Sequence, residues 1–275
     1  MLGAILGDIV GSAYERRPTK RVDFPLFLPE SRFTDDTVLT AATAEALMCQ
    51  AAAGPASEEE RAERYAARYR RYYFRYPDAG FGGMFRAWCR APGLPVQESY
   101  GNGGAMRVSP IGFALDTPQA VLREAEISCR FTHRHPEGTA GAQAAALAVF
   151  LARTGCSKEE IAVRIRRRFG YDLSRPLRSI RPGFVFDSRA GYSVPPAIRA
   201  FLESDDVESA IRLAVSLGGD SDTMACIAGG IAHAYYGAVP PPLARQGLAR
   251  LDGSLRGVVC AFCTRYRIPG AEAWA

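Results

Sequence analysis

The amino-acid sequence predicts an all-α fold, a compact single helical domain that spans residues 1–275. Helical patterns of small and apolar residues dominate the chain, whereas alternating strand patterns are scarce and residues 183–186 are the best short candidate. Neither a clear linker nor a tandem repeat divides the chain. With 48% hydrophobic residues, a chain of this length can form one large core.

The expected helices begin and end at recognisable signals. Ser57 with Glu60, and Ser157 with Glu160, have the spacing of a capping box. Thr117 precedes a proline at a first helical position, and Gly155 is a natural stop. In chain order, we expect helices over residues 38–50, 57–75, 118–130, 137–153, 157–169, 196–203, 207–217, 224–236 and 243–251.

Composition excludes several classes of protein. The net charge of +5 and the pI near 8.9 suit an anionic ligand but are far from those of a nucleic-acid-binding tail, so nucleic acid is not required as a partner. Residues 1–11 are apolar but interrupted by Gly3, Gly7 and Asp8, and no segment has the length of a membrane span. The number of cysteines, seven, is odd, and several of them lie in apolar runs. We therefore expect reduced thiols in a cytoplasmic protein.

Two short acidic segments carry the clearest chemical signal. Thr34-Asp35-Asp36 and Asp220-Ser221-Asp222-Thr223 each precede a run of small and apolar residues. Together they offer carboxylate and hydroxyl oxygens, the ligands of hard divalent cations such as Mg²⁺ and Mn²⁺. Each segment alone also fits a helix cap, because Asp, Ser and Thr satisfy the free N–H groups at helix starts. Two like-charged clusters that shared one site would require a cation between them.

Other segments allow two interpretations. Glycine-rich turns at residues 80–83, 100–104 and 218–219 allow close backbone approach to a ligand, although each also fits an ordinary turn. Tyrosines and arginines interleave over residues 64–76, but the tyrosines recur at helical spacing, which favours a packed aromatic face over a nucleic-acid surface. His133 lies in a polar break between helices and could contact a ligand, whereas His233 lies in an apolar helix and is expected to be structural.

In order along the chain, these motifs resemble those of the ADP-ribosylglycohydrolases. The matching segments are Gly7-Asp8-x-x-Gly11-Ser12-x-x-Glu15, Thr34-Asp35-Asp36-Thr37, Tyr100-Gly101-Asn102-Gly103-Gly104-Ala105-Met106-Arg107, Thr132-His133 and Ser216-Leu217-Gly218-Gly219-Asp220-Ser221-Asp222-Thr223. The resemblance implies a compact all-α fold with a binuclear Mg²⁺ or Mn²⁺ centre in a cleft. The stretch from Asp187 to Pro195 is less typical of the family.

The resemblance also assigns roles to residues. It implies metal ligation by Thr34, Asp35, Asp36, Asp220, Asp222 and Thr223. It places Glu15 at the mouth of the site, where it gates the substrate and acts on the water, and makes Asp36 the second catalytic residue. The substrate would be contacted by Ser99, Tyr100, Gly101, Asn102, Gly103 and His133.

The expected activity is metal-dependent hydrolysis of the glycosidic bond at the terminal ribose of an ADP-ribosylated protein or small molecule, by a monomer. Two alternatives stay open at this point. One is a metal-dependent nucleotide phosphohydrolase, which would use the same ligands, and the other is a non-catalytic ADP-ribose-binding module. The linkage that is cleaved is also open, whether to arginine, serine, an acetyl ester, a nucleobase or another adduct.

Overall fold

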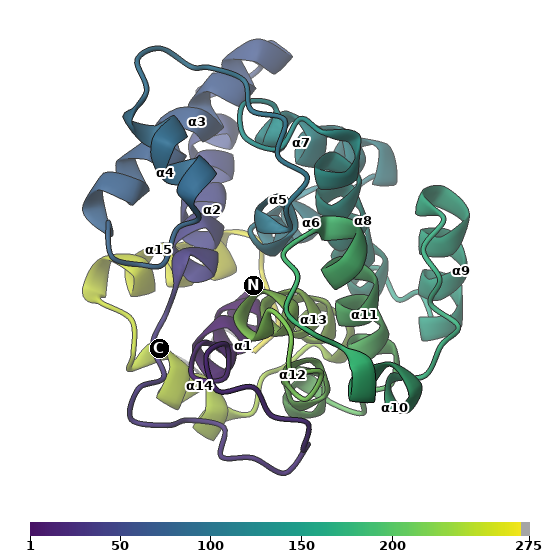
Figure 1. Cartoon of the computed structure of the whole chain (residues 1–275). Coiled ribbons are helices and arrows are strands. Elements are labelled where there is room, and N and C mark those ends of the chain that lie inside the picture. Colours follow the sequence, from purple (N-terminus) through teal and green to yellow (C-terminus); the bar gives the residue numbers. More distant parts are fainter. Residues whose placement is uncertain (271–275) are drawn as a thin grey trace.

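Two helices that lie far apart in the sequence form the centre of the computed structural model, which describes residues 1–270. They are α1 (Leu2–Ser12) and α13 (Ser221–Tyr236), and they lie side by side in the middle of Figure 1. Nearly every residue of both helices is buried. A helix that is apolar on all sides belongs inside a protein, and these two form the core around which the other helices pack.

Glycines allow α1 and α13 to touch through their backbones. Gly3, Gly7 and Gly11 recur every four residues and therefore line one face of α1. A Cβ atom added to Gly7 would lie 2.0 Å from the carbonyl oxygen of Ala225, and one on Gly11 would lie 2.4 Å from that of Ser221. These glycines, which interrupt the apolar sequence of α1, thus form the surface through which it contacts α13. They place the end of α1 beside the start of α13.

The remaining helices surround this pair. On one side, α2 (Asp35–Ala53) packs against α1, α3 (Glu58–Arg75), α6 (Ser109–Ala114) and α15 (Gly253–Arg265), with α4 (Gly83–Arg90) on α3. On the other side, α8 (Pro136–Arg153) contacts α5 (Gly103–Met106), α7 (Pro118–Cys129), α9 (Lys158–Phe169), α11 (Ala190–Leu202) and α13. The set is completed by α10 (Leu177–Ile180), the 3₁₀ turn η1 (Arg181–Gly183), α12 (Val207–Val215) and α14 (Pro241–Leu248).

The all-α prediction is confirmed, and its capping signals form as expected. The side chains of Ser57 and Ser157 each accept a hydrogen bond from the backbone N–H three residues later. The glutamate at that later position accepts one from the backbone N–H of the serine. Thr117 accepts one from the backbone N–H of Ala120. The aromatic face of α3 is also confirmed, because Tyr65, Tyr69, Tyr72 and Tyr73 are buried.

The strand candidate at residues 183–186 is wrong. Gly183 ends η1, and residues 184–186 form no regular structure, because no neighbouring strand pairs with them. Within residues 1–270 the only β-type pairings are two isolated bridges, Glu98 with His133 and Gly101 with Arg189. The expected helix at 196–203 also begins earlier, at Ala190, and contains Pro195 and Pro196 in its interior.

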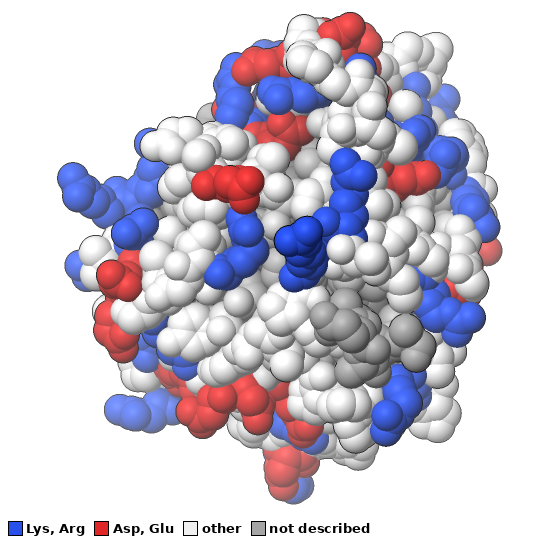
Figure 2. All heavy atoms as spheres, turned by 180° about the vertical axis from the view of Figure 1, so that it is seen from behind, with Lys and Arg blue, Asp and Glu red and all other residues white. Residues whose placement is uncertain are grey.

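The surface and the thiols agree with the composition. On the face shown in Figure 2, basic and acidic side chains are interspersed. The seven cysteines are all unpaired. In the described part of the chain, none of the helices combines the length and the apolar character needed to cross a membrane.

Candidate functional site

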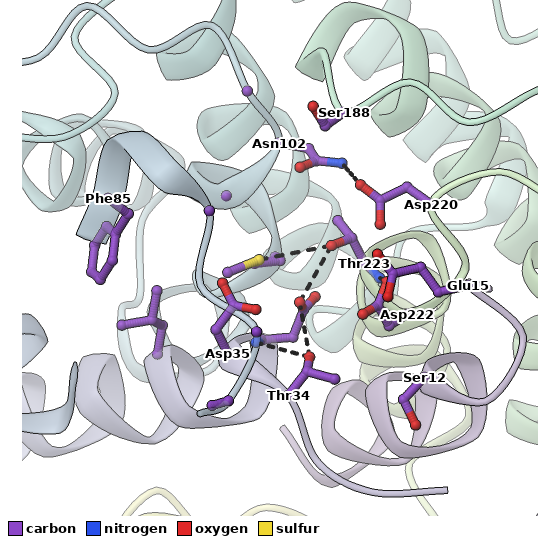
Figure 3. Close-up of a pocket in the computed structure, with 18 of the residues that line it drawn as sticks. Ser12, Glu15, Thr34, Asp35, Phe85, Asn102, Ser188, Asp220, Asp222 and Thr223 are labelled. Atoms are coloured by element: carbon purple, nitrogen blue, oxygen red, sulfur yellow. Dashed lines mark hydrogen bonds between the residues drawn. The ribbon is translucent and has the colours of Figure 1, made fainter. Parts of the chain in front are cut away.

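A cavity of about 890 Å³ opens where the start of α2, the end of α1 and the start of α13 meet. Figure 3 shows carboxylates from the start of α2, from the start of α13 and from Glu15, just after α1, gathered on its floor. The segments at 79–85 and 97–103 form further parts of its wall. The two acidic segments predicted to share a site therefore lie together, although they are widely separated in the sequence.

Thr34 and Asp8 satisfy the start of α2. Thr34 is its N-cap, and its hydroxyl lies 3.4 Å from the backbone N–H of Asp36. Asp8, on α1, accepts hydrogen bonds from the Thr34 hydroxyl at 2.6 Å and from the backbone N–H groups of Thr34 and Thr37 at 2.9 and 3.0 Å. Because these groups already serve the helix end, the carboxylates of Asp35 and Asp36 are not needed as caps.

Asp36 is buried with unused bonding capacity. Its Oδ2 atom accepts a weak hydrogen bond from the Thr223 hydroxyl at 3.3 Å and lies 3.4 Å from the Thr34 hydroxyl, whose proton is directed to Asp8. Its Oδ1 atom is buried and has no hydrogen-bond partner in the described structure. A buried carboxylate oxygen without a donor is costly, and a bound cation would satisfy it. Thr223 joins the two acidic segments, since it lies on α13 and donates to a residue of α2.

At the start of α13, the Asp220 carboxylate is likewise not used as a cap. Asp220 occupies the N-cap position but its side chain makes no cap hydrogen bond. Instead it accepts one at 2.8 Å from the side-chain amide of Asn102. Asp222 accepts from the backbone N–H of Thr223 at 2.9 Å. Helix capping therefore explains Thr34 and the bond to Asp222, but not the carboxylates of Asp35, Asp36 and Asp220.

The carboxylates form two groups that share Asp222. One oxygen from each of Asp8, Asp36 and Asp222 lies within 4.8 Å of the others, and the same holds for Glu15, Asp220 and Asp222. Such a set of oxygen donors suits hard divalent cations. Asp8 has no role in the sequence-based site. The sequence signal that could have identified Asp8 as part of the site was its place in the first of the matching motifs.

Burial and mutual repulsion raise the pKa values of these acids. Burial, followed by the charge of Asp8, raises the pKa of Asp35 to about 8. The pKa of Asp36 rises well above its usual value through burial and the charges of Asp8 and Asp35. Burial and the charge of Asp220 do the same for Asp222 and, to a smaller extent, raise the pKa of Glu15. Without a cation, ionising all of these carboxylates at once would be unfavourable, because they are buried and repel one another.

Asp35 and Glu15 both line the cavity, but in different positions. Asp35 is half-buried and belongs to neither of the two groups. Glu15 is exposed, and its carboxylate lies beside Asp220 and Asp222 (Figure 3). Arg16 and Arg32 also line this side and oppose the rise in the pKa of Glu15. Glu15 is thus the one exposed member of the two carboxylate groups.

The glycine-rich loop is tied to the acidic cluster through Asn102. Besides bonding Asp220, the Asn102 amide donates to the Ser193 hydroxyl at 3.1 Å, and its backbone N–H donates to the Ser188 carbonyl at 2.8 Å. Ser99 accepts from the backbone N–H of Gly101 at 3.2 Å. Ser99, Gly101, Asn102 and Gly103 line the cavity. Tyr100 is exposed, packs edge-on against His135 and does not line it.

His133 lies on the cavity wall behind this loop. It is buried, and burial together with the charge of Arg107 lowers the pKa of its ring well below the usual value. A Cβ atom on Gly103 would lie 3.0 Å from its Nε2 atom, so the loop approaches the ring closely. The atypical stretch also reaches the site, because Ser188 lines the cavity and anchors Asn102.

Comparisons with known proteins agree with this geometry. A sequence model described as ADP-ribosylglycohydrolase matches residues 1–267. The ADP-ribosylhydrolase ARH3 of Homo sapiens is 31% identical, over 86% of this chain and 84% of that protein. The ADP-ribosylarginine hydrolase Tri1 of Pseudomonas putida is 28% identical, over 88% of this chain and 71% of that protein. A solved ADP-ribosylglycohydrolase-related protein complex aligns with a TM-score of 0.61 at 28% identity, over 97% of this chain and 96% of that one.

Proposed function

Because this chain belongs to the ADP-ribosylglycohydrolase family, we propose that it hydrolyses the glycosidic bond at the terminal ribose of ADP-ribosylated substrates and releases ADP-ribose. The observation that carries the proposal is the pair of carboxylate groups that share Asp222 on the floor of a cavity walled by the glycine-rich loop. The cavity volume of about 890 Å³ is within the range that holds a nucleotide-sized ligand.

Two divalent cations, Mg²⁺ or Mn²⁺, fit this donor set. The residues proposed to hold them are Asp36, Asp220 and Asp222, with Thr34, Asp35 and Thr223 beside them as the resemblance implies. Asp8 joins the set through its group with Asp36 and Asp222. The unsatisfied Oδ1 atom of Asp36 supports this assignment, because it is buried and otherwise without a partner. Cations bound there would coordinate ribose hydroxyls and lower the pKa of a bound water molecule.

Glu15 is the proposed acid–base residue. Cleavage at the anomeric carbon passes through an oxocarbenium-like state, and a carboxylate can orient and deprotonate the attacking water. Glu15 is exposed, lines the cavity and lies adjacent to Asp220 and Asp222, which suits this role.

The remaining contacts would hold the substrate. Ser99, Gly101, Asn102 and Gly103 offer backbone N–H and side-chain groups to the diphosphate and ribose, and His133 offers a ring nitrogen beside them. Tyr100 is exposed at the edge of the loop, from where it could contact the adenosine part of the ligand. Asn102 links this binding surface to the cluster through Asp220, which would keep the ribose in register with the carboxylates.

Product analysis tests the proposal. Purified protein with Mg²⁺ is incubated with a panel of peptides ADP-ribosylated on arginine or serine, with an acetyl ester of ADP-ribose, and with ADP-ribose itself. We expect free ADP-ribose from at least one adduct and no AMP. Release of AMP with a ribose 5-phosphate product, from cleavage of the diphosphate, would instead indicate a nucleotide phosphohydrolase, and tight ADP-ribose binding without any turnover would indicate a binding module.

A further inference from the structure

Arg107 is a buried cation with no acidic partner. It is 0% exposed, and none of the ion pairs among the described residues includes it. Its guanidinium group lies over the ring of Tyr69, with the carbon 4.2 Å from the ring centroid. One nitrogen, Nη2, donates to the Ser128 carbonyl at 3.1 Å and to the Thr132 hydroxyl at 2.7 Å, whereas Nε and Nη1 are buried without partners. Burying an arginine in this way is costly, so its contacts call for an explanation.

The Thr132 hydroxyl connects Arg107 to His133. Thr132 is buried, and its oxygen lies 2.7 Å from Arg107 Nη2 and 3.0 Å from His133 Nδ1. A guanidinium group can only donate, so the Thr132 oxygen is the acceptor in the first of these bonds. The hydroxyl has one proton, and among the described residues its one acceptor in reach is His133 Nδ1. When the hydroxyl donates this proton to Nδ1, Nδ1 is the acceptor and the neutral ring carries its own proton on Nε2.

The backbone fixes where that proton points. The His133 N–H donates to the Cys129 carbonyl at 2.8 Å, and its carbonyl accepts from the Thr139 hydroxyl at 2.9 Å. The Nε2 atom faces Gly103, where an added Cβ would be 3.0 Å away. Within residues 1–270 Nε2 has no protein hydrogen-bond partner, and the ring lines the cavity. An acceptor for the Nε2 proton must therefore come from the cavity.

We propose that Arg107 is a positioning residue that, through Thr132, holds His133 as its Nε2–H tautomer and so presents a hydrogen-bond donor to a substrate oxygen at Gly103. This inference rests on the proposed function, which supplies phosphate and ribose oxygens as acceptors in that place. The opposite tautomer would point a lone pair at those oxygens. Arg107 thus acts on the ligand without touching it, through one hydroxyl and one ring.

Nuclear magnetic resonance of the free protein tests the tautomer directly. Two-bond nitrogen–proton spectra of protein with ¹⁵N-labelled histidine distinguish the two neutral tautomers. The chain has three histidines, so the loss of one set of signals in His133→Gln identifies this ring. We expect wild-type His133 to be the Nε2–H tautomer near neutral pH. An Nδ1–H tautomer in the wild-type protein would overturn the proposal, whatever the activity of the enzyme.

Two substitutions at Thr132 and one at Arg107 test the connection. Thr132→Val keeps the shape but removes the hydroxyl, Thr132→Ser restores it, and Arg107→Met removes the donor. We expect Thr132→Val and Arg107→Met to shift His133 toward the Nδ1–H tautomer and Thr132→Ser to leave it unchanged. An unchanged tautomer in Thr132→Val would show that Thr132 does not set it. If the Arg107 variant does not fold, the two Thr132 variants still decide the question.

Calorimetric titration with ADP-ribose then tests the consequence. Loss of a hydrogen bond to a charged ligand predicts about a tenfold or greater increase in Kd for Thr132→Val and a Kd close to wild type for Thr132→Ser. A near wild-type Kd in Thr132→Val, with its tautomer changed, would remove His133 as the substrate donor. If the wild-type protein itself does not bind ADP-ribose, the proposed function fails, while the spectra still report separately on the tautomer.

Discussion

The Asp8 carboxylate of α1 accepts the Thr34 hydroxyl at 2.6 Å and its backbone N–H at 2.9 Å, and so joins α1 to the start of α2. A third bond, from the Thr37 N–H at 3.0 Å, completes the contact. Asp8 is fully buried and also belongs to one carboxylate group of the cavity floor. One side chain thus fixes the position of Asp36 relative to α13.

This relationship predicts different costs for two substitutions. Asp8→Ala leaves two buried N–H groups and a hydroxyl without their acceptor, so we expect the free energy of unfolding to fall by about 2 kcal/mol or more. Asp8→Asn keeps an acceptor oxygen and should cost less. Denaturant unfolding of both variants checks this, with the exposed Asp205→Asn as a control that stays near wild type. Equal stability of Asp8→Ala and the wild type would show that these bonds do not hold α2.

The contact between α1 and α13 predicts opposite effects for two glycine-to-alanine changes. In Gly7→Ala the new Cβ would lie 2.0 Å from the Ala225 carbonyl oxygen, so the helices must separate, at a cost of about 1–3 kcal/mol or more. Gly257, on α15, has nothing within 4 Å, so Gly257→Ala should stabilise by up to about 1 kcal/mol through helix propensity. Thermal unfolding measures both. A stabilised Gly7→Ala would contradict the packing described here.

Much of this arrangement follows from the sequence, and the reasons for the rest are physical. The acidic segments and their helices were predictable because they are local: Asp and Thr precede small, apolar runs. The role of Gly3, Gly7 and Gly11 was not, because a stripe of glycines gains meaning only from the partner helix, some 200 residues away in the sequence. The hydrogen bonds of Asp8 to α2, and of Asn102 to Asp220, are long-range for the same reason.

The predictions of a strand at 183–186 and of a helix that begins at residue 196 were wrong for different reasons. A short apolar run such as 183–186 needs a pairing partner to become a strand, and this fold provides none within residues 1–270. The prolines at 195 and 196 suggest a helix start, but here they lie inside α11, which is held by packing against α8, α12 and α13.

Removal of a proposed metal ligand should abolish hydrolysis and leave the fold intact. We expect Asp36→Asn and Asp222→Asn to lose about 100-fold or more in turnover at limiting Mg²⁺, because each removes a charged oxygen from the cluster. Folding should survive, since the substitution also relieves repulsion among buried carboxylates. Steady-state rates and circular dichroism provide the two readouts. Near wild-type turnover in both variants would remove these residues from the site.

Glu15 should matter more for turnover than for binding. Glu15→Gln keeps the shape but cannot accept a proton, so we expect kcat to fall by about 10²–10⁴-fold with little change in the Kd for ADP-ribose. Glu30→Gln is the matched control, because Glu30 also lines the cavity but pairs with Arg17. Single-turnover hydrolysis and calorimetric titration measure the two quantities. Equal losses in rate and affinity would make Glu15 a binding or gating residue.

The central claim is that the carboxylates around Asp222 hold two divalent cations above which the ribose is cleaved. Its most direct test is a crystal structure of the protein soaked with Mn²⁺, with anomalous difference maps recorded near the manganese edge. We expect two peaks about 3.5–4 Å apart, one beside Asp36 and Asp222 and the other beside Glu15, Asp220 and Asp222. Empty density at both groups, with Mn²⁺ bound elsewhere or not at all, would contradict this account of the site.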